Sequence, residues 1–219
     1  MTGGNIERAD EKRAAMVMTQ IISRGVHDER VLDAMRKVPR ERFVREKDLD
    51  LAFYDGPLSI GSGQTISQPY IVAYMTEMLS ISEKDRVLEV GTGCGYQTAV
   101  LAEVAAEVYS VEIVEELSER ARSILQELGY DNIELKTGDG TEGWPEHAPF
   151  DAIMVTAAPA RVPELLVEQL AGGGRMIVPV GVYEQYLKLV MKKEGEVEER
   201  NLIGVRFVPM TGRARGREE

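Results

Sequence analysis

Three glycines follow a short apolar segment near the middle of the chain and could hold a polar ligand. Residues 86–90 have the apolar character of a buried strand, and Gly91, Gly93 and Gly95 alternate directly after them. Glycine lets the backbone turn where a Cβ atom would clash. A helical pattern begins at Tyr96, so the free N–H groups of its first turn would face the glycines. This order of strand, glycine turn and helix is typical of the first half of a nucleotide-binding βαβ unit.

The spacing of the glycines separates two classes of nucleotide. The dinucleotide fingerprint G-x-G-x-x-G requires a glycine where this chain has Tyr96. The pattern from Glu89 to Gly95 instead resembles the first motif of methyltransferases that depend on S-adenosylmethionine (AdoMet). The Glu89 carboxylate could then hold the methionine ammonium group, directly or through water. A nicotinamide dehydrogenase and a turn without any ligand are the alternatives at this point.

Polar residues also stand at the ends of the next three predicted strands. Glu112 ends the second strand and could accept both hydroxyl groups of a ribose. Asp139, followed by Gly140, comes after the third strand and could accept from an adenine amino group. Residues 156–159 follow the fourth strand. Because an open parallel sheet binds ligands at the carboxyl ends of its strands, we expect one site at this edge. A surface glutamate and a turn aspartate are the alternative interpretations.

A polar loop lies upstream of the first strand of this unit. Gln64, Thr65 and Ser67 stand on a segment preceded by glycines, where they could line the same site. Ser67 could also cap a helix that runs to Leu79, with Pro69 in its first turn. The spacing alone favours the cap, and the two roles are compatible.

The elements expected around these residues alternate between helix and strand. Residues 5–24 and 28–38 predict amphipathic helices, and residues 40–66 are expected to be irregular. Residues 85–180 predict alternating strands and helices, and residues 185–208 predict an antiparallel hairpin. The predicted strands are 86–90, 107–111, 133–136, 150–155, 175–180, 185–192 and 196–208, and the predicted helices between the parallel strands are 95–104, 114–128 and 163–170.

This order of elements indicates an α/β fold of the Rossmann-like type. We expect a doubly wound, mostly parallel sheet with an N-terminal helical extension and a C-terminal antiparallel hairpin. Residues 1–80 would form the extension with the polar loop, residues 81–212 the AdoMet-binding methyltransferase core, and residues 213–219 a tail.

The composition limits the possible partners and compartments. The chain has 219 residues, 43% of them hydrophobic, and its net charge of −11 disfavours nucleic acid as the main partner. Its apolar runs are shorter than the roughly 20 residues of a membrane span, and its first residues lack the apolar stretch of a signal peptide. A cytoplasmic protein is therefore expected. The single cysteine, Cys94, excludes an internal disulfide, and with only two histidines we expect no metal site.

Neither histidine is expected to act as a catalytic base, which is informative about the acceptor. Methyl transfer from a sulfonium requires an acceptor atom with a free lone pair. A carboxylate with an ordinary pKa of about 4 is already ionised at pH 7. Its methylation therefore requires alignment and removal of water rather than a base. The hydroxyl groups of Ser67 and Thr65 could orient such an oxygen.

Five segments narrow the resemblance from methyltransferases in general to one family. They are residues 61–69, 87–98, 138–140, 150–159 and 205–209. Together they resemble protein-L-isoaspartate (D-aspartate) O-methyltransferase over about residues 15–210. The first and last segments are the specific ones, because general methyltransferases lack them. Cys94 stands where relatives often have serine, which is a mild departure.

The resemblance implies a reaction and a role for each matching residue. Members of this family methylate the α-carboxylate of L-isoaspartyl residues and the β-carboxylate of D-aspartyl residues in damaged proteins, which starts repair through a succinimide. By position, Ser67 and Thr65 would be the catalytic hydroxyls. The cofactor contacts would be Gln64, Ile66, Glu89, Gly91, Thr92, Gly93, Glu112, Ile113, Asp139, Gly140 and Thr211. The substrate contacts would be Thr156, Ala157, Ala158, Pro159, Val205, Arg206, Phe207 and Val208.

The resemblance also implies which partners to expect. We expect a monomer that takes isoaspartyl-containing proteins and peptides as substrates, without a nucleic-acid or membrane partner. A methyltransferase for another acceptor, such as a small acid, is one alternative, and residues 64–67 disfavour it. A non-enzymatic module that binds AdoMet or damaged protein is another.

Overall fold

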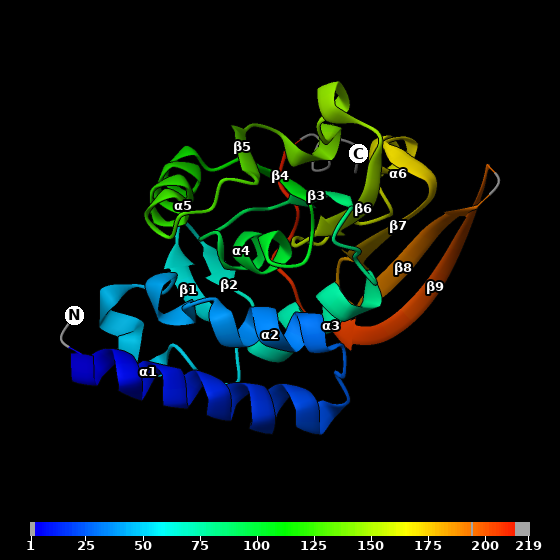
Figure 1. Ribbon diagram of the computed structural model, residues 1–219. Helices are drawn as coiled ribbons and strands as arrows, with labels where there is room; N and C mark the ends of the chain where they lie inside the picture. The colour runs from blue at the N-terminus through cyan, green and yellow to red at the C-terminus, as the bar shows by residue number, and fades with distance from the viewer. Residues whose placement is uncertain (1–2, 194, 213–219) are drawn as a thin grey trace.

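A seven-stranded sheet crosses the molecule, and helices cover its faces (Figure 1). The computed structural model describes residues 3–193 and 195–212, with side chains from residue 8 onward. The strand order is β5-β4-β3-β6-β7-β8-β9. The first five strands in this order are parallel, and β8 and β9 are antiparallel to their neighbours. The predicted fold class, a mostly parallel sheet with a C-terminal antiparallel hairpin, is confirmed.

Burial on both faces explains the apolar character of the central strands. In β3, Val87 packs into the cluster on the side of the N-terminal helices, and Leu88 packs into the cluster that includes α6. Strands covered on both faces read as nearly continuous apolar runs, which is why they were predictable. The strands are β3 (Arg86–Val90), β4 (Glu107–Glu112), β5 (Ile133–Thr137), β6 (Phe150–Val155), β7 (Leu170–Val180), β8 (Gln185–Lys193) and β9 (Glu196–Val205).

The helices between the parallel strands agree with expectation except at α6. α4 (Tyr96–Ala102) and α5 (Glu115–Glu127) lie within the predicted ranges. α6 (Glu164–Glu168) has five residues, so the predicted helix over 163–170 is too long. Leu170 already opens β7, where it pairs with Phe150. Gly172, Gly173 and Gly174, which precede the predicted strand over 175–180, therefore lie within β7.

A layer of helices packs on one face of the sheet (Figure 1). The helix expected over residues 5–24 is present, but it changes its winding twice before it ends at Gly25, whose φ is +90°. Asp28 caps the next helix by accepting from the backbone N–H groups of Arg30 and Val31. The layer consists of α1 (Gly3–Met16), the π turn η1 (Val17–Ile21), the 3-10 turn η2 (Ile22–Arg24), α2 (Glu29–Lys37) and α3 (Pro69–Met78).

A small hairpin stands where irregular chain was expected. β1 (Leu58–Gly61) and β2 (Gln64–Ile66) pair antiparallel, after the short turns η3 (Arg40–Arg42) and η4 (Glu46–Leu51). The prediction for residues 40–66 is therefore wrong at its end. Strands of four and three residues are too short to show the alternation that identifies a strand in a sequence.

The C-terminal hairpin extends away from the body of the sheet (Figure 1). β9 ends at Val205, so the predicted strand over 196–208 is three residues too long. The chain then turns back along the carboxyl edge of the sheet, where Pro209 forms an isolated parallel bridge with Ala158. The predicted tail, residues 213–219, lies outside the described residues.

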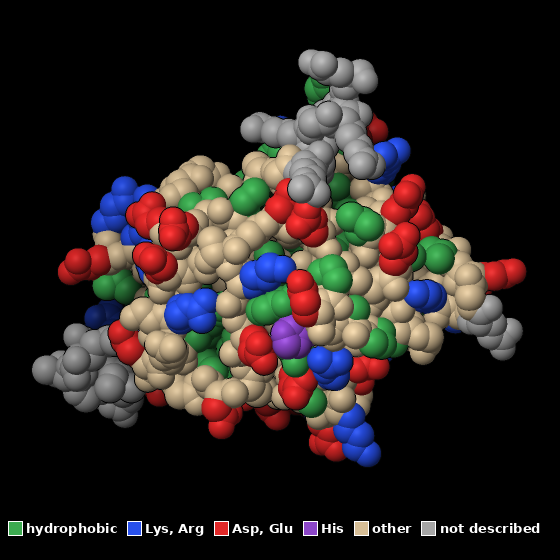
Figure 2. All heavy atoms as spheres, turned by 90° about the horizontal axis from the view of Figure 1, so that it is seen from above, with side chains coloured by type: hydrophobic (Ala, Val, Ile, Leu, Met, Phe, Trp, Pro, Cys, Tyr) green, Lys and Arg blue, Asp and Glu red, His purple; other side chains and the backbone are tan. Residues whose placement is uncertain are grey.

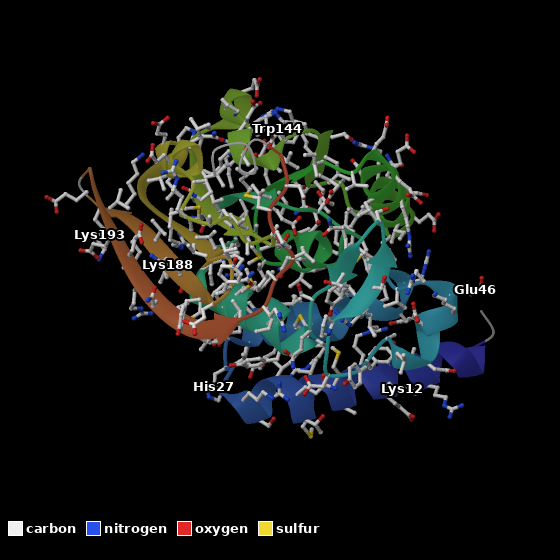
Figure 3. All side chains as sticks on the ribbon, turned by 180° about the vertical axis from the view of Figure 1, so that it is seen from behind. Lys12, His27, Glu46, Trp144, Lys188 and Lys193 are labelled. Carbon is white, nitrogen blue, oxygen red and sulfur yellow. The ribbon has the colours of Figure 1, made fainter. Side chains whose placement is uncertain are left out.

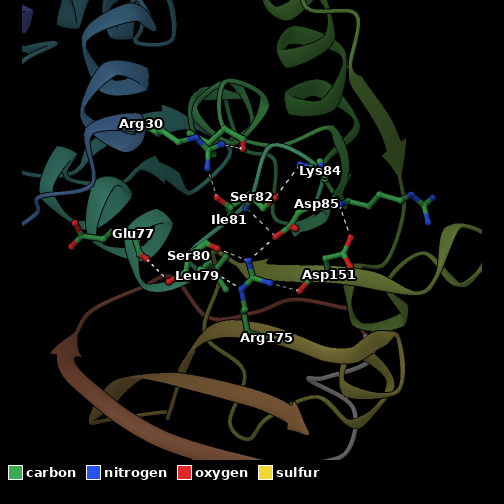
Figure 4. A network of polar contacts seen from close by, with 12 residues as sticks. Arg30, Glu77, Leu79, Ser80, Ile81, Ser82, Lys84, Asp85, Asp151 and Arg175 are labelled. Atoms are coloured by element: carbon green, nitrogen blue, oxygen red, sulfur yellow. Dashed lines mark hydrogen bonds and ion pairs between the residues drawn. The ribbon is translucent and has the colours of Figure 1, made fainter. Parts of the chain in front are cut away.

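An arginine network fastens the helical layer to the amino edge of the sheet (Figure 4). Arg175 of β7 donates to the carbonyl oxygen of Ser80 at 2.5 Å and to Asp85 Oδ2 at 2.6 Å. Arg30 of α2 donates to the carbonyl oxygen of Ile81 at 2.6 Å. Hydrogen bonds thus connect residues on both sides of the predicted boundary between the extension (1–80) and the core (81–212).

Charged side chains of both signs are interspersed over the face seen from above (Figure 2). On this face, the described basic side chains lie among acidic ones rather than in one continuous patch (Figure 2). Within the described part of the chain, no helix is long and apolar enough to cross a membrane.

Candidate active site

Two adjoining cavities open at the carboxyl ends of the parallel strands. The small cavity has a volume of about 70 Å³, and the large cavity has a volume of about 990 Å³. Thr65, Thr156, Val208 and Pro209 line both of them. The chain thus brings its polar strand ends and its polar loop to one place, where the two cavities share a wall.

Most of the predicted site residues line one of these cavities, and six line neither. Ser67 lines the large cavity and Thr65 lines both. Predicted cofactor contacts in the small cavity are Gln64, Gly91, Gly93, Glu112, Ile113, Gly140 and Thr211. Predicted substrate contacts are Ala157 in the small cavity, Thr156 and Val208 in both, and Val205, Arg206 and Phe207 in the large cavity. The six that line neither are Ile66, Glu89, Thr92, Asp139, Ala158 and Pro159.

The glycine turn forms one wall of the small cavity because its backbone approaches neighbouring groups closely. Gly91 has a φ of +100°, and a Cβ atom there would lie 2.3 Å from Thr156 Oγ1. The Thr156 hydroxyl donates instead to the carbonyl oxygen of Gly91 at 2.6 Å. A side chain at position 91 would therefore clash with Thr156 and require a backbone conformation that favours glycine.

Glu112 ends β4 and lies beside this turn, where it also lines the small cavity. Its Oε2 accepts from the Gly93 N–H at 2.8 Å, and its Oε1 accepts from the Val114 N–H at 2.9 Å. Only 5% of the residue is exposed, yet it lines the cavity. An ionised carboxylate has roughly four acceptor positions. Two backbone N–H groups therefore fix its orientation and leave it able to accept from hydroxyl groups of a ligand.

Glu89 lies behind the turn, and its carboxylate is fully buried. Its Oε2 accepts from Thr98 Oγ1 at 2.5 Å and from Ser110 Oγ at 2.6 Å. Within the described part of the chain, its Oε1 has no hydrogen-bond partner. Burial raises the pKa of Glu89 to about 8, although the hydroxyls of Ser110 and Thr98 oppose the shift, and the charge of Glu112 adds to it.

The expected direct contact between Glu89 and a ligand ammonium group has no support in this arrangement, because Glu89 does not line the small cavity. Thr92 is placed similarly. Its hydroxyl shares a hydrogen bond of 2.6 Å with Ser110, and only 4% of the residue is exposed. The side chains of Glu89 and Thr92 are therefore both buried beneath the glycine turn rather than facing the cavity.

Asp139 supports the small cavity indirectly. Its Oδ1 accepts from the Thr141 N–H at 2.9 Å and from Thr141 Oγ1 at 2.7 Å, which caps the short turn η5 (Gly140–Glu142). A Cβ atom at Gly212 would lie 2.4 Å from the same oxygen, so the carboxylate packs against the C-terminal segment. The residue that faces the small cavity is Gly140.

Ser67 lines the large cavity, and its prediction as the cap of the following helix is wrong. α3 begins at Pro69, and the capping position is occupied by Gln68, which forms no capping hydrogen bond. Ser67 lies one residue further upstream and lines the large cavity. Ile66 points away from both cavities into the core and is 3% exposed.

Arg40 fixes the main chain of this loop and was not predicted. Its Nη2 donates to the carbonyl oxygen of Ser67 at 2.8 Å, and its Nε donates to that of Ala52 at 2.8 Å. Its guanidinium lies 4.7 Å from the ring centroid of Tyr96. Arg40 has no exposed surface, and burial lowers its pKa. A buried arginine has no signature in a single sequence, because most arginines are exposed.

The C-terminal segment over residues 206–211 forms the outer wall of both cavities. The Ala158 N–H donates to the Val208 carbonyl oxygen at 2.8 Å, and the Met210 N–H donates to the Ala158 carbonyl oxygen at 2.8 Å. The Pro159 carbonyl oxygen accepts from Gly181 at 3.0 Å. Ala158 and Pro159, which were predicted to hold substrate, therefore use these backbone groups to hold the protein's own chain.

The histidines lie away from both cavities. His27 lies beside the N-terminal helical layer (Figure 3), where its backbone N–H donates to Glu77 Oε1. The His147 ring stacks 4.5 Å from the ring of Tyr109. Among the described residues, no group of three or more histidine, cysteine, aspartate or glutamate side chains could hold a metal ion.

Comparisons with known proteins give one consistent result. The family model of protein-L-isoaspartate (D-aspartate) O-methyltransferase matches residues 11–215. A protein-L-isoaspartate O-methyltransferase from Picosynechococcus sp. is 54% identical over 204 residues, which cover 93% of this chain and 92% of the relative. One from Opitutus terrae is 55% identical over 208 residues, which cover 94% of this chain and 89% of the relative.

Two solved structures resemble the whole described fold. A protein-L-isoaspartate O-methyltransferase superimposes with a TM-score of 0.84 at 32% identity, covering 93% of this chain and 66% of that one. A structure from Plasmodium falciparum, described by the same enzyme name and in complex with S-adenosyl-L-homocysteine, superimposes with a TM-score of 0.80 at 26% identity, covering 91% of this chain and 98% of that one.

Proposed function

The chain belongs to the protein-L-isoaspartate (D-aspartate) O-methyltransferase family, and from this premise we propose how its two cavities divide the reaction. The protein is an AdoMet-dependent methyltransferase that acts on isoaspartyl residues in protein repair. The acceptor is the free α-carboxylate of an L-isoaspartyl residue or the β-carboxylate of a D-aspartyl residue, and the ester starts repair through a succinimide.

The small cavity holds the cofactor. Gly91 and Gly93 let the backbone approach the ligand, Glu112 accepts from ribose hydroxyl groups, and Gly140 faces the adenine side. The fit rests on Glu112, whose carboxylate is oriented by two backbone N–H groups and still faces the cavity. When bound, AdoMet supplies an electrophilic methyl group on a sulfonium. Glu89, Thr92 and Asp139 act behind the wall and keep its shape.

The large cavity holds the substrate peptide. The Ser67 and Thr65 hydroxyls donate to the acceptor carboxylate and direct one of its oxygens towards the junction of the two cavities. No base is required, because this carboxylate is already ionised at neutral pH. Both cavities are lined by Thr65, Thr156 and Val208. This junction supports the proposal, because it is the place where the methyl donor and the acceptor can meet.

Residues 1–80 and residues 81–212 contribute different sides of this site. The extension supplies the loop with Thr65 and Ser67, and the core supplies the cofactor turn and the C-terminal segment. We propose a monomer, because residues of a single chain line both cavities. We also propose a cytoplasmic location, which the buried, unpaired Cys94 supports, since free thiols persist in reducing compartments.

Methyl transfer to a defined peptide tests the proposed acceptor. A peptide with one L-isoaspartyl residue and labelled AdoMet should give a base-labile ester, and the same peptide with a normal aspartyl residue should give almost none. Transfer to a small acid but not to the isoaspartyl peptide would contradict the proposal.

A further inference from the structure

The amide of Gln185 forms a strand-like pair with the main chain of Phe207. Its Oε1 accepts from the Phe207 N–H at 2.6 Å, and its Nε2 donates to the Phe207 carbonyl oxygen at 3.2 Å. Both residues line the large cavity. A glutamine amide offers an acceptor and donors on one planar group, as a peptide unit does. The side chain therefore takes the place of a main-chain partner for Phe207.

The turn before β8 explains why a side chain is used here. The ladder between β8 and β9 ends at the pair of Gln185 and Val205, two residues short of Phe207. Upstream of Gln185 the main chain bends sharply, and a Cβ atom at Gly181, whose φ is +132°, would lie 1.9 Å from the Glu184 carbonyl oxygen. The residues before Gln185 are thus directed away from Phe207. The Gln185 amide therefore extends the pairing of β8 with β9 beyond the end of the strand.

The segment after β9 is consequently held on two sides. Gln185 holds Phe207 from the side of β8, and Ala158 holds the Val208 carbonyl oxygen from the side of β6. The Gln185 amide occupies the Phe207 N–H and one of the two lone pairs of the Phe207 carbonyl oxygen. A bound peptide therefore cannot accept from the Phe207 N–H unless the Gln185 amide moves away, which changes the expectation that each of residues 205–208 holds substrate.

We propose that Gln185 is a positioning residue for peptide binding, because its amide fixes residues 206–208 as a preformed wall of the large cavity. The inference rests on the proposed function, since it requires that the large cavity bind the peptide. Holding the wall in place before the peptide arrives reduces the ordering cost of binding. Loss of the amide should then weaken peptide binding more than it slows the chemical step.

Two substitutions separate this role from a merely structural one. Gln185→Glu keeps the size of the side chain but places a second acceptor against the Phe207 carbonyl oxygen. Gln185→Met keeps the length and removes both hydrogen bonds. For each variant that folds, we expect the KM for an isoaspartyl peptide to rise about tenfold, which corresponds to about 1.4 kcal/mol. We expect kcat to change by less than about threefold and S-adenosylhomocysteine affinity by less than about twofold.

Gln169 provides the matched control, because its amide makes the same kind of pair elsewhere. Its Oε1 accepts from the Trp144 N–H at 2.8 Å, and its Nε2 donates to the Glu142 carbonyl oxygen at 2.8 Å. Gln169→Glu disturbs a buried amide of equal chemistry outside both cavities, so it should lower stability and leave the peptide KM within about twofold of wild type.

Two outcomes would overturn the proposal. One is a folded Gln185 variant with an unchanged peptide KM. The other is a rise in peptide KM matched by an equal loss of cofactor affinity or by the Gln169 control, which would indicate a general structural effect. Absence of wild-type activity on isoaspartyl peptides would instead contradict the proposed function, so the two failures are distinguishable.

Discussion

Two carboxylates at the two ends of β3 have opposite environments. Asp85, just before the strand, accepts from Arg175 at 2.6 Å and from the Ser82 N–H at 3.0 Å. Glu89, near the end of the strand, is fully buried, and within the described residues its carboxylate accepts from the hydroxyls of Thr98 and Ser110. The acid at the amino edge has a cation, whereas the acid at the carboxyl edge has none among the described residues.

The two edges of the sheet therefore differ in role. The amino edge attaches the helical layer, and the carboxyl edge faces the cavities for ligands. At the amino edge, arginine side chains join the helical layer to the sheet. At the carboxyl edge, Glu112 retains acceptor capacity and hydroxyl side chains face a cavity. Substitutions at the amino edge should therefore affect stability, and substitutions at the carboxyl edge should affect binding, catalysis or response to pH.

The largest expected effect is the pH dependence that Glu89 gives to stability. Because its pKa is raised from 4.5 to about 8, the folded chain keeps a proton between these values that the unfolded chain has lost. Stability should therefore fall as the pH rises through this window. From pH 5 to pH 7, this one group can contribute up to about 2.7 kcal/mol. Glu89→Gln should lack that decrease.

Urea unfolding of wild type and Glu89→Gln at pH 5 and pH 7 measures this difference. The variant should be relatively more stable at pH 7. Equal changes in the free energy of unfolding for both proteins would show that Glu89 does not keep its proton in the folded state.

The second effect concerns the acid that faces the small cavity. Glu112→Gln turns an amide N–H₂ group towards one of the two backbone donors and removes the charge. We expect AdoMet affinity to fall about 30-fold, or about 2 kcal/mol, in a calorimetric titration. Glu116→Gln, at an exposed position of α5 outside both cavities, is the control. An equal loss in both variants would mean that net charge, rather than the Glu112 contact, determines the affinity.

The third effect tests the amino edge. Arg175→Met removes one donor from Asp85, which keeps the Ser82 N–H, and the donor to the Ser80 carbonyl oxygen, so the free energy of unfolding should fall by about 1.5 kcal/mol. The turnover of the folded variant should stay within about twofold of wild type. Arg36→Met removes an exposed ion pair with Asp33 and should cost less than about 0.5 kcal/mol. A large loss of turnover at 25 °C in Arg175→Met would contradict the expectation that substitutions at the amino edge affect stability rather than catalysis.

The smallest effect is expected at the catalytic loop. Ser67→Ala removes one hydroxyl donor to the acceptor carboxylate, so kcat should fall about fivefold, or about 1 kcal/mol. AdoMet affinity should be unchanged, because Ser67 does not line the small cavity. Single-turnover kinetics with saturating peptide measures the step. A loss of AdoMet affinity with normal turnover would show that Ser67 serves the cofactor instead.

The sequence predicts what short-range patterns encode. β3 and β6 were predicted residue for residue, because a strand buried on both faces is a continuous apolar run. Glu112 and Gly140 were placed at one edge because the carboxyl ends of parallel strands meet there. Prediction fails where a side chain binds distant main chain. Arg40 and Ser67 are 27 residues apart, and Gln185 and Phe207 are 22 residues apart, so neither pair leaves a local signal.

The wall that the two cavities share has a consequence for kinetics. Residues 208–211 form one side of the small cavity, and Val208 and Pro209 also line the large cavity. A peptide lying against Val208 would cover the side on which the two cavities adjoin. Turnover should consequently follow a compulsory order, in which the methyl donor enters first, the methylated peptide departs, and the spent donor is released last.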